Sequence, residues 1–247
     1  MESDGENSTN LAEMSSKGVD SETSRLVSTN TNANPSYLNI ISNISALTFI
    51  GIITYCCFKD GVNLFSFHPT LMAFGWIFIM TTAVNAITPG DMATEWMPIR
   101  LRSARHWLLQ VIGGIVLLVG FLVILVNKIV NEKPHFATLH AKFGLASLIF
   151  MVLTMLGGLG ALYSLKLKAY LAPIYTKLLH ASVGLITFTL GIITICLGLF
   201  SQWWSKVGDD ILRYISLVLV LLVMIFTVLR PTLKIYFRLK ERLENSN

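Results

Sequence analysis

Charged side chains are scarce in this sequence: Asp, Glu, Lys and Arg together make up 13% of its 247 residues. Hydrophobic residues make up 53%, and they fall in long blocks instead of the short periodic stripes of a water-soluble domain. Cysteine is scarce as well. The three cysteines, Cys56, Cys57 and Cys196, lie within or at the edge of apolar blocks, which argues against a disulfide framework. These shortages indicate an integral membrane protein.

The apolar blocks have the length of membrane-spanning helices, about 20 residues for a hydrocarbon layer of roughly 30 Å. Helices are required because lipid offers no hydrogen-bond partner to backbone amides, and the alternating strands of a membrane barrel are not seen. The expected spans are Leu38–Phe58, Phe67–Ile87, Trp107–Asn127, His140–Leu162, Leu179–Trp203 and Ile211–Leu229. The sequence therefore predicts an all-α membrane protein with six transmembrane helices and with both termini on one side.

Basic residues near the spans predict which side that is. Eleven of them lie in the second and fourth loops and at the C-terminal end, against six on the opposite face, so we expect both termini to be cytoplasmic. This topology accounts for the net charge of +5, and nothing supports nucleic acid as a partner. An alternative for each single cation is a contact with anionic membrane lipid.

Composition divides the chain into three parts. Residues 1–36 are rich in Ser, Thr, Asn and acidic side chains and hold almost no large apolar residues, so we expect a disordered cytoplasmic tail. Residues 37–233 would form the six-helix transmembrane domain, and residues 234–247 a basic cytoplasmic C-terminal tail. No apolar segment begins before residue 38, so the first span is expected to act as the insertion signal.

Four histidines recur at the water-facing ends of consecutive spans: His68, His106, His140 and His180, separated by 38, 34 and 40 residues. Imidazole is a common axial ligand of haem iron. A polar, ionisable side chain near a membrane boundary is energetically costly, so four histidines there indicate a function. With cytoplasmic termini, His68 and His140 lie at the non-cytoplasmic side, and His106 and His180 at the cytoplasmic side. Two ligands of one iron must share one depth, so these pairs predict two bis-histidine haems. Because no C-x-x-C-H occurs to attach haem covalently, both would be non-covalent haem b.

Small residues follow the histidines along the same helix faces. After His180, glycine occurs at every seventh position, at Gly184, Gly191 and Gly198, and glycines also follow the other three histidines at helical spacing. A flat macrocycle needs such room, but close packing between membrane helices uses glycine as well. For the glycines alone, close packing is the favoured interpretation; together with the histidines they favour haem.

Two other interpretations of the histidines stay open at this point. They would be interfacial side chains of a non-enzymatic membrane scaffold, since an imidazole tip reaches the headgroups, or they would serve a haem-free metal transporter. The matched depth of the histidines weighs against the first interpretation. The lack of acidic residues in the expected spans and of an i, i+4 histidine pair weighs against the second.

Three stretches resemble the histidine motifs of the cytochrome b561 family: LFSFHPTLMAFG (residues 64–75), KPHFATLHAKFG (133–144) and KLLHASVG (177–184). The similarity is greatest to the branch made of a lone transmembrane domain, the ascorbate-dependent reductases, and it covers roughly residues 38–240. It implies a central four-helix bundle that holds two b-type haems. It also implies an oxidoreductase that passes electrons from cytoplasmic ascorbate to monodehydroascorbate or ferric iron on the lumenal or extracellular side. A homodimer is expected from the family, and an endomembrane, endoplasmic reticulum or vesicle, is favoured over the plasma membrane.

The donor implied by this resemblance points to cations at the cytoplasmic histidine pair. Ascorbate is an anion near neutral pH, so its docking surface should present positive charge. Arg100 and Arg105 precede His106, and Lys177 precedes His180 by less than one turn, which makes these three cations the candidate ascorbate-binding residues. An alternative for part of this cluster is pairing with haem propionates.

The acceptor side has its own candidates. Lys133, His135 and Lys142 flank His140 and could meet an acceptor anion or a ferric chelate. An ordinary solvent-exposed histidine is an equally weighted interpretation of His135.

Overall fold

The computed structural model describes residues 37–88, 91, 93, 94 and 96–244. The tail predicted for residues 1–36 lies outside this part of the chain. The regular elements in the described residues are helices, and no strand occurs among them. Six of the described helices are long and apolar enough to cross a membrane. The prediction of an all-α, multi-pass membrane protein with six transmembrane helices is therefore confirmed.

The second span is a composite of three consecutive elements, and the other five spans are single helices. In chain order the elements are α2 (Tyr37–Phe58), α3 (Leu64–Ala73), η1 (Phe74–Met80), α4 (Thr81–Ala86), α5 (Ile99–Val130), α6 (Leu139–Leu162), α7 (Pro173–Leu199), the single turn α8 (Trp204–Val207) and α9 (Asp210–Glu244). Three helices extend well beyond the expected spans: α5 begins at Ile99 instead of Trp107, α7 begins at Pro173 instead of Leu179, and α9 continues to Glu244 instead of ending at Leu229. Charged residues end an apolar block but not a helix, because a helix that leaves the hydrocarbon meets water and can carry Arg and Lys.

Capping residues determine where two of the histidine-bearing helices begin. Asn63 caps α3, and its side chain accepts a hydrogen bond from the backbone N–H of Ser66 at 3.1 Å. Thr138 caps α6 in the same way for the N–H of Ala141 at 3.2 Å. His140 is consequently the second residue of α6 and lies at its very start.

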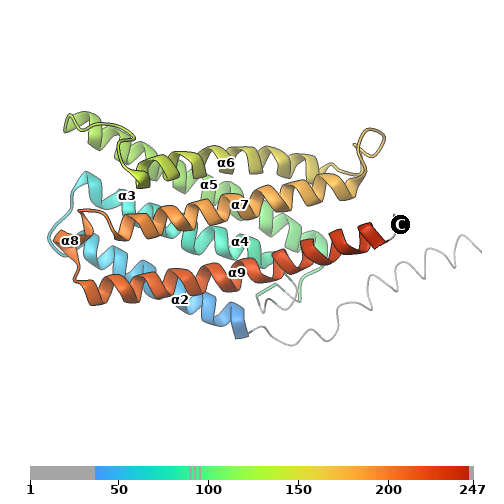
Figure 1. The fold of residues 1–247 in the computed structure, drawn as a ribbon, viewed down its shortest axis with the longest axis horizontal. Helices are drawn as coiled ribbons and strands as arrows, with labels where there is room; N and C mark the ends of the chain where they lie inside the picture. Colours follow the sequence, from blue (N-terminus) through green and yellow to red (C-terminus); the bar gives the residue numbers. More distant parts are fainter. Residues whose placement is uncertain (1–36, 89–90, 92, 95, 245–247) are drawn as a thin grey trace, which may run out of the picture. The chain divides into compact units, whose positions relative to one another are not determined.

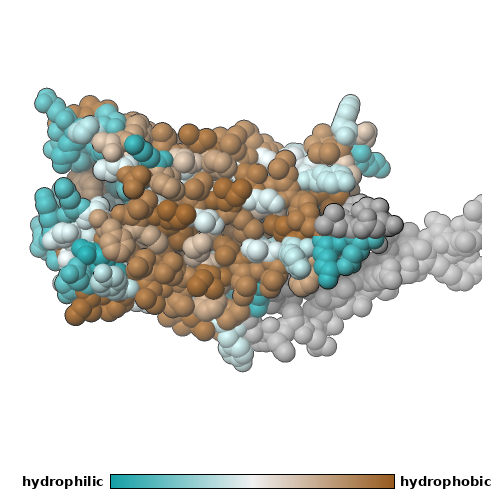
Figure 2. Space-filling view, in the orientation of Figure 1, coloured by the Kyte–Doolittle hydropathy of each residue, from teal (hydrophilic) through white to brown (hydrophobic). Residues whose placement is uncertain are grey.

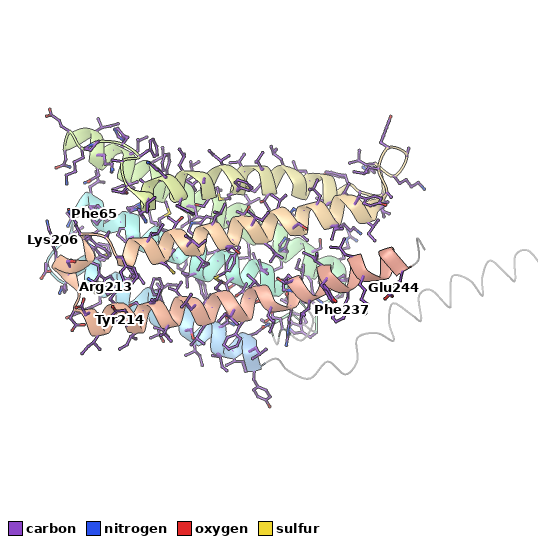
Figure 3. All side chains as sticks on the ribbon, in the orientation of Figure 1. Phe65, Lys206, Arg213, Tyr214, Phe237 and Glu244 are labelled. Carbon is purple, nitrogen blue, oxygen red and sulfur yellow. The ribbon has the colours of Figure 1, made fainter. Side chains whose placement is uncertain are left out.

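Figure 1 shows the spans as a bundle of helices that run along one common direction. The antiparallel helices α6 and α7 form one hairpin, the composite second span and α5 form another, and α2 packs against α9. On the face seen in Figure 2, hydrophobic residues cover the middle of the bundle and hydrophilic residues gather at its two ends, as lipid on the sides and water at the ends require. We call the end where α3 and α6 begin the His68 end and the end where α5 and α7 begin the His106 end. Figure 3 shows Lys206 and Arg213 at the His68 end and Glu244 at the other.

Two glycines allow close helix contacts in the interior of the bundle. A Cβ atom at Gly75 would lie 2.6 Å from Cδ2 of Leu117, and one at Gly191 would lie 2.5 Å from the indole of Trp76. Both of these neighbours are buried, with Leu117 0% and Trp76 2% exposed. At these two positions the glycines serve close helix packing.

The middle of the second span is π-helical from Phe74 to Met80. A π-helical turn accommodates one more residue than an α-helical turn, and such segments are frequent at functional sites. The segment carries several buried side chains, among them Trp76, Ile77 and Met80. It therefore changes the register of the second span in the interior of the bundle.

Candidate functional site

The structure brings the four histidines of the sequence analysis together as two pairs. The ring centroids of His68 and His140 are 6.2 Å apart with the planes at 87°, and those of His106 and His180 are also 6.2 Å apart with the planes at 82°. These are the two pairs expected from depth. Each pair joins the two hairpins, because α3 faces α6 in the first pair and α5 faces α7 in the second.

Every one of the four rings is held by a hydrogen bond between Nδ1 and a backbone carbonyl of its hairpin partner. The Nδ1 to oxygen distances are 2.9 Å for His68 to Gly120, 2.7 Å for His106 to Ala83, 2.9 Å for His140 to Thr194 and 3.2 Å for His180 to Thr154. A carbonyl oxygen only accepts, so Nδ1 carries the proton in each ring. Nε2 therefore keeps its lone pair, and the neutral imidazole is in the tautomer that binds a metal through Nε2.

The acceptor carbonyls follow a common register. Gly120 lies 14 residues after His106, Thr154 lies 14 after His140, Thr194 lies 14 after His180, and Ala83 lies 15 after His68. The one additional residue falls in the second span, which alone of these four helices contains the π-helical segment Phe74–Met80. At a rise of 1.5 Å per residue, 14 residues correspond to roughly 21 Å, so the two pairs lie about that far apart along the bundle.

Glycines beside two of the rings give the imidazoles room. A Cβ atom at Gly158 of α6 would lie 3.2 Å from Cε1 of His180, and one at Gly198 of α7 would lie 3.3 Å from Cε1 of His140. Each of these glycines comes one turn after the carbonyl that accepts from the same ring. Because Cα–Cβ bonds tilt toward the helix N-terminus, a larger side chain at either position would cover that carbonyl. The space predicted from the glycine pattern is therefore filled at Gly158 and Gly198 by the histidine ring of the neighbouring helix.

The surroundings of the His68–His140 pair are apolar and form a pocket beside the two rings. Besides the two histidines, the pocket is lined by Phe49, Ile53, Phe65, Pro69, Met72, Ala73, Ile195, Gly198, Leu199, Ser201 and Trp203. Imidazole nitrogen binds a metal ion at about 2.0 Å, so a metal between the rings would occupy roughly 4 Å of the centroid separation and leave the remainder for the two half-rings. The donor set, the ring separation and the apolar pocket fit a haem iron.

The predicted cations at the His106 end lie in different environments. Arg100 and Lys177 are exposed, whereas Arg105 is half-buried and donates from Nη1 to a backbone carbonyl of the loop before α5 at 3.2 Å. Arg102, which the sequence analysis did not single out as a site residue, is 4% exposed, and its Nε donates to the carbonyl of Met97 at 3.0 Å. Arg102 thus fastens the loop that leads into α5. Its residue type gives no hint of this role, because only the fold determines which face of α5 is buried.

The predicted residues at the His68 end are all on the surface. Lys133, His135 and Lys142 are exposed. The ring of His135 lies beside that of Phe136, with the centroids 6.2 Å apart. These side chains are therefore accessible to a molecule that approaches this end of the bundle.

Lys128 is a residue at the same end that the sequence analysis did not propose for the site. It lies in the last turn of α5, and its Nζ donates to the carbonyl of Pro134 at 2.7 Å. Lys128 follows Gly120, the anchor of His68, by two helical turns, and this spacing becomes a signal only once the anchor is known.

A helical bundle that crosses the membrane six times and holds two anchored imidazole pairs at different depths defines a membrane cytochrome. A family model described as eukaryotic cytochrome b561 matches residues 67–206, which is more than half of the chain and includes all four histidines. The chain belongs to the cytochrome b561 family. Membership in this family implies that it binds haem b.

Curated relatives are similar over more than half of this chain. Transmembrane reductase CYB561D2 of Mus musculus is 33% identical over 148 residues, which cover 60% of this chain and 66% of the relative, and the Homo sapiens protein of the same name is 32% identical over the same shares. Probable transmembrane reductase CYB561D1 of Mus musculus is 26% identical over 166 residues, 67% of this chain and 72% of the relative. The chain thus spans just under two thirds of the length of the CYB561D2 proteins that it matches.

Proposed function

We propose that this protein is a transmembrane di-haem reductase that moves single electrons from ascorbate in the cytoplasm to monodehydroascorbate or ferric iron on the lumenal or extracellular side. The observation that carries the proposal is the anchoring of all four Nδ1 atoms by backbone carbonyls, since it leaves four Nε2 atoms for two metal ions. The printed names of the mouse and human relatives, transmembrane reductases, support the reaction class.

In this proposal His68 and His140 hold one haem b and His106 and His180 hold the other, without a covalent bond to the protein. Bound haem b supplies reversible one-electron oxidation and reduction. The chain fixes each imidazole in one tautomer and one orientation, and the carbonyl acceptor at Nδ1 raises the basicity of Nε2. With one imidazole nitrogen from each histidine of a pair, each site would hold a haem suited to outer-sphere electron transfer and not to oxygen binding.

The basic loops favour the cytoplasm for the His106 end. Arg100 and Lys177 are exposed there and Arg105 is half-buried one residue before His106, so these cations attract an ascorbate anion toward the His106–His180 pair. Arg105 also holds the neighbouring loop through its hydrogen bond, which leaves Arg100 and Lys177 as the side chains with the greatest freedom to reach a ligand.

At the opposite end, the exposed Lys133, His135 and Lys142 would receive the acceptor anion or ferric chelate. We propose an endomembrane, of the endoplasmic reticulum or of vesicles, as the location, and a homodimer as the assembly, on the basis of the family resemblance. Because the basic loops favour the cytoplasm for the His106 end, we propose that both termini are cytoplasmic.

Haem content per chain tests the ligand assignment. The protein is purified after expression with haem supply, and the haem-to-protein ratio and the reduced absorption spectrum are measured for wild type, His68→Ala, His106→Ala and His135→Ala. We expect two haems in the wild type, one in each of the first two variants, and two in His135→Ala, because His135 is exposed and has no place in either pair. A preparation without a Soret band, or equal haem loss in His135→Ala and His106→Ala, would refute the assignment.

Reconstituted vesicles test the reaction and its direction. Vesicles are loaded with ascorbate, and reduction of external monodehydroascorbate and of an external ferric chelate is followed in parallel, with protein-free vesicles as the control. We expect reduction in proteoliposomes alone, and a lower rate at limiting ascorbate in Arg100→Ala with unchanged haem content. Metal uptake into the vesicles without any reduction would instead favour the transporter interpretation of the histidines.

A further inference from the structure

Trp76 is a buried aromatic residue that connects the two hairpins. It lies in the π-helical segment Phe74–Met80 and is 2% exposed. Its indole packs onto Gly191 of α7, where a Cβ atom would lie 2.5 Å from Cδ2 and Cε3 and 2.8 Å from Cε2. The ring therefore crosses from the hairpin of the second span to the α6–α7 hairpin, as the two histidine pairs do.

The position of Trp76 along the bundle is between the two pairs. Trp76 lies eight residues after His68 and seven before Ala83, so its Cα is near the midpoint. Its Cα–Cβ bond tilts toward the helix N-terminus, which directs the indole from there toward the His68 end. The position of Gly191 is consistent with this direction. Gly191 precedes Thr194, whose carbonyl anchors His140 at the His68 end, by three residues or about 4.5 Å. The indole thus lies within the interval of roughly 21 Å that separates the pairs, nearer to the His68 end.

The π-helical segment makes this position compatible with the anchor of His106. In a regular α-helix, one additional residue after His68 would rotate every later residue by about 100°. The wide turn absorbs that residue, so the Ala83 carbonyl still faces α5 and accepts from His106 at 2.7 Å, while Trp76 faces α7. Trp76 is therefore directed into the space between the hairpins without loss of a ligand anchor.

We infer that Trp76 is the aromatic bridge that couples the two histidine-held haems electronically, an inference that rests on the proposed function. One electron leaves the iron at the His106 end, which goes from ferrous to ferric, and reaches the iron at the His68 end, which goes from ferric to ferrous. No bond is formed or broken, no proton moves, and the indole is neither oxidised nor reduced. Trp76 is buried and its indole reaches across from the second span to α7, so it places a π-system in the path between the two pairs.

A mutation series separates bridging from packing. Trp76→Phe keeps an aromatic ring, Trp76→Leu removes it, and Leu117→Ala removes buried apolar volume from the same core without touching an aromatic ring, since Leu117 is 0% exposed and packs on Gly75. Haem content, reduced spectra and midpoint potentials are measured first. The rate of electron equilibration between the two haems after a flash of photoreductant is then followed at wavelengths where the two haems differ.

We expect unchanged haem content and potentials in all three variants, a several-fold slower equilibration in Trp76→Leu, and a rate close to wild type in Trp76→Phe and Leu117→Ala. Two haems with an unchanged rate in Trp76→Leu would overturn the bridge but leave the proposed function intact. An equally slow Leu117→Ala would also overturn it, because loosened packing would then suffice. Wild-type protein without haem would refute the proposed function itself, and the bridge with it.

A second variant keeps the test valid if Trp76→Leu does not fold. Gly191→Ala retains the indole but displaces it, because the new Cβ would lie 2.5 Å from the ring. Gly160→Ala is the matched control, since a Cβ at Gly160 meets nothing within 4 Å. Slower equilibration in Gly191→Ala alone is the expected result, and equal rates in the two glycine variants would contradict the role of Trp76.

Discussion

Gly158 and Gly160 lie on the same helix, two residues apart, yet alanine should weaken haem binding at the first position and have no effect on it at the second. A Cβ at Gly158 would lie 3.2 Å from Cε1 of His180, which is tighter than ordinary contact, so the ring must move by a few tenths of an ångström. The hydrogen bond from Nδ1 of His180 to Thr154 is already 3.2 Å long, at the upper end of the usual range, and such a shift breaks it. A lost hydrogen bond of this kind is worth about 1 kcal/mol, which corresponds to a roughly fivefold loss of haem affinity at this pair.

The second glycine of this kind gives an internal comparison. A Cβ at Gly198 would lie 3.3 Å from Cε1 of His140, but the Nδ1 bond of His140 to Thr194 is 2.9 Å long and tolerates the same shift. Gly198→Ala should therefore weaken its haem less than Gly158→Ala does. Gly160→Ala brings the same gain in helix propensity as the other two alanine substitutions. Because a Cβ atom at Gly160 would meet nothing within 4 Å, this variant should leave haem affinity unchanged.

The assay is transfer of haem to an excess of a haem-scavenging protein, followed at the Soret band. In a His68→Ala background only the His106–His180 haem is expected to remain, so the effect of Gly158→Ala is measured on that haem alone. The reasoning would be refuted by a loss that Gly160→Ala reproduces. It would equally be refuted if Gly158→Ala weakened the haem of the other pair and spared its own.

Two further substitutions follow from hydrogen bonds that the sequence did not reveal. Arg102→Ala should lower the free energy of unfolding by about 2 kcal/mol, because it removes a charged donor that is buried against Met97; thermal unfolding in detergent measures this, and the exposed Arg100→Ala should leave the midpoint unchanged. Lys128→Met should loosen the loop after α5, since the bond from Nζ to Pro134 is lost, whereas Lys128→Arg can keep a donor there; hydrogen exchange of residues 131–138 is the measurement, and equal protection in both variants would contradict it.

The number of spans and the approximate limits of the apolar core were predictable because both depend on long apolar runs. The start of α5 at Ile99 was not, since its first two turns carry Arg100, Arg102 and Arg105 and leave the apolar block. The histidine intervals were sufficient to propose two pairs, because depth follows from topology alone. The anchors of the rings could not be predicted, since a backbone carbonyl has no residue type to recognise.

The glycine pattern shows how one sequence signal divides into different physical roles. Gly184, Gly191 and Gly198 recur every seventh residue on α7 and look equivalent in the sequence. In the structure Gly191 receives the indole of Trp76, Gly198 lies beside His140, and a Cβ at Gly184 would meet only an ordinary contact at 3.5 Å. Periodicity identifies the face of a helix that is closely packed, but the neighbouring helix decides what packs there.

The two nitrogens of each imidazole act in two different directions. Nδ1 bonds within a hairpin, between the second span and α5 or between α6 and α7, while the ring faces its partner across the gap between hairpins. Each hairpin can therefore orient its own two rings, and haem would then join the hairpins to each other. Orientation before binding reduces the conformational entropy that is lost when the ligand binds.

This division also explains why the histidine intervals are unequal without harm to the site. The loops between spans can vary in length. What must stay constant is the number of residues, along one helix, between its histidine and the backbone carbonyl that anchors the other histidine of the same hairpin. That number is 14 on three helices, and on the second span the π-helical turn absorbs the fifteenth. The site is therefore defined by the register between the two helix backbones of each hairpin. The histidine positions give one half of that register, and the anchoring carbonyls give the other half.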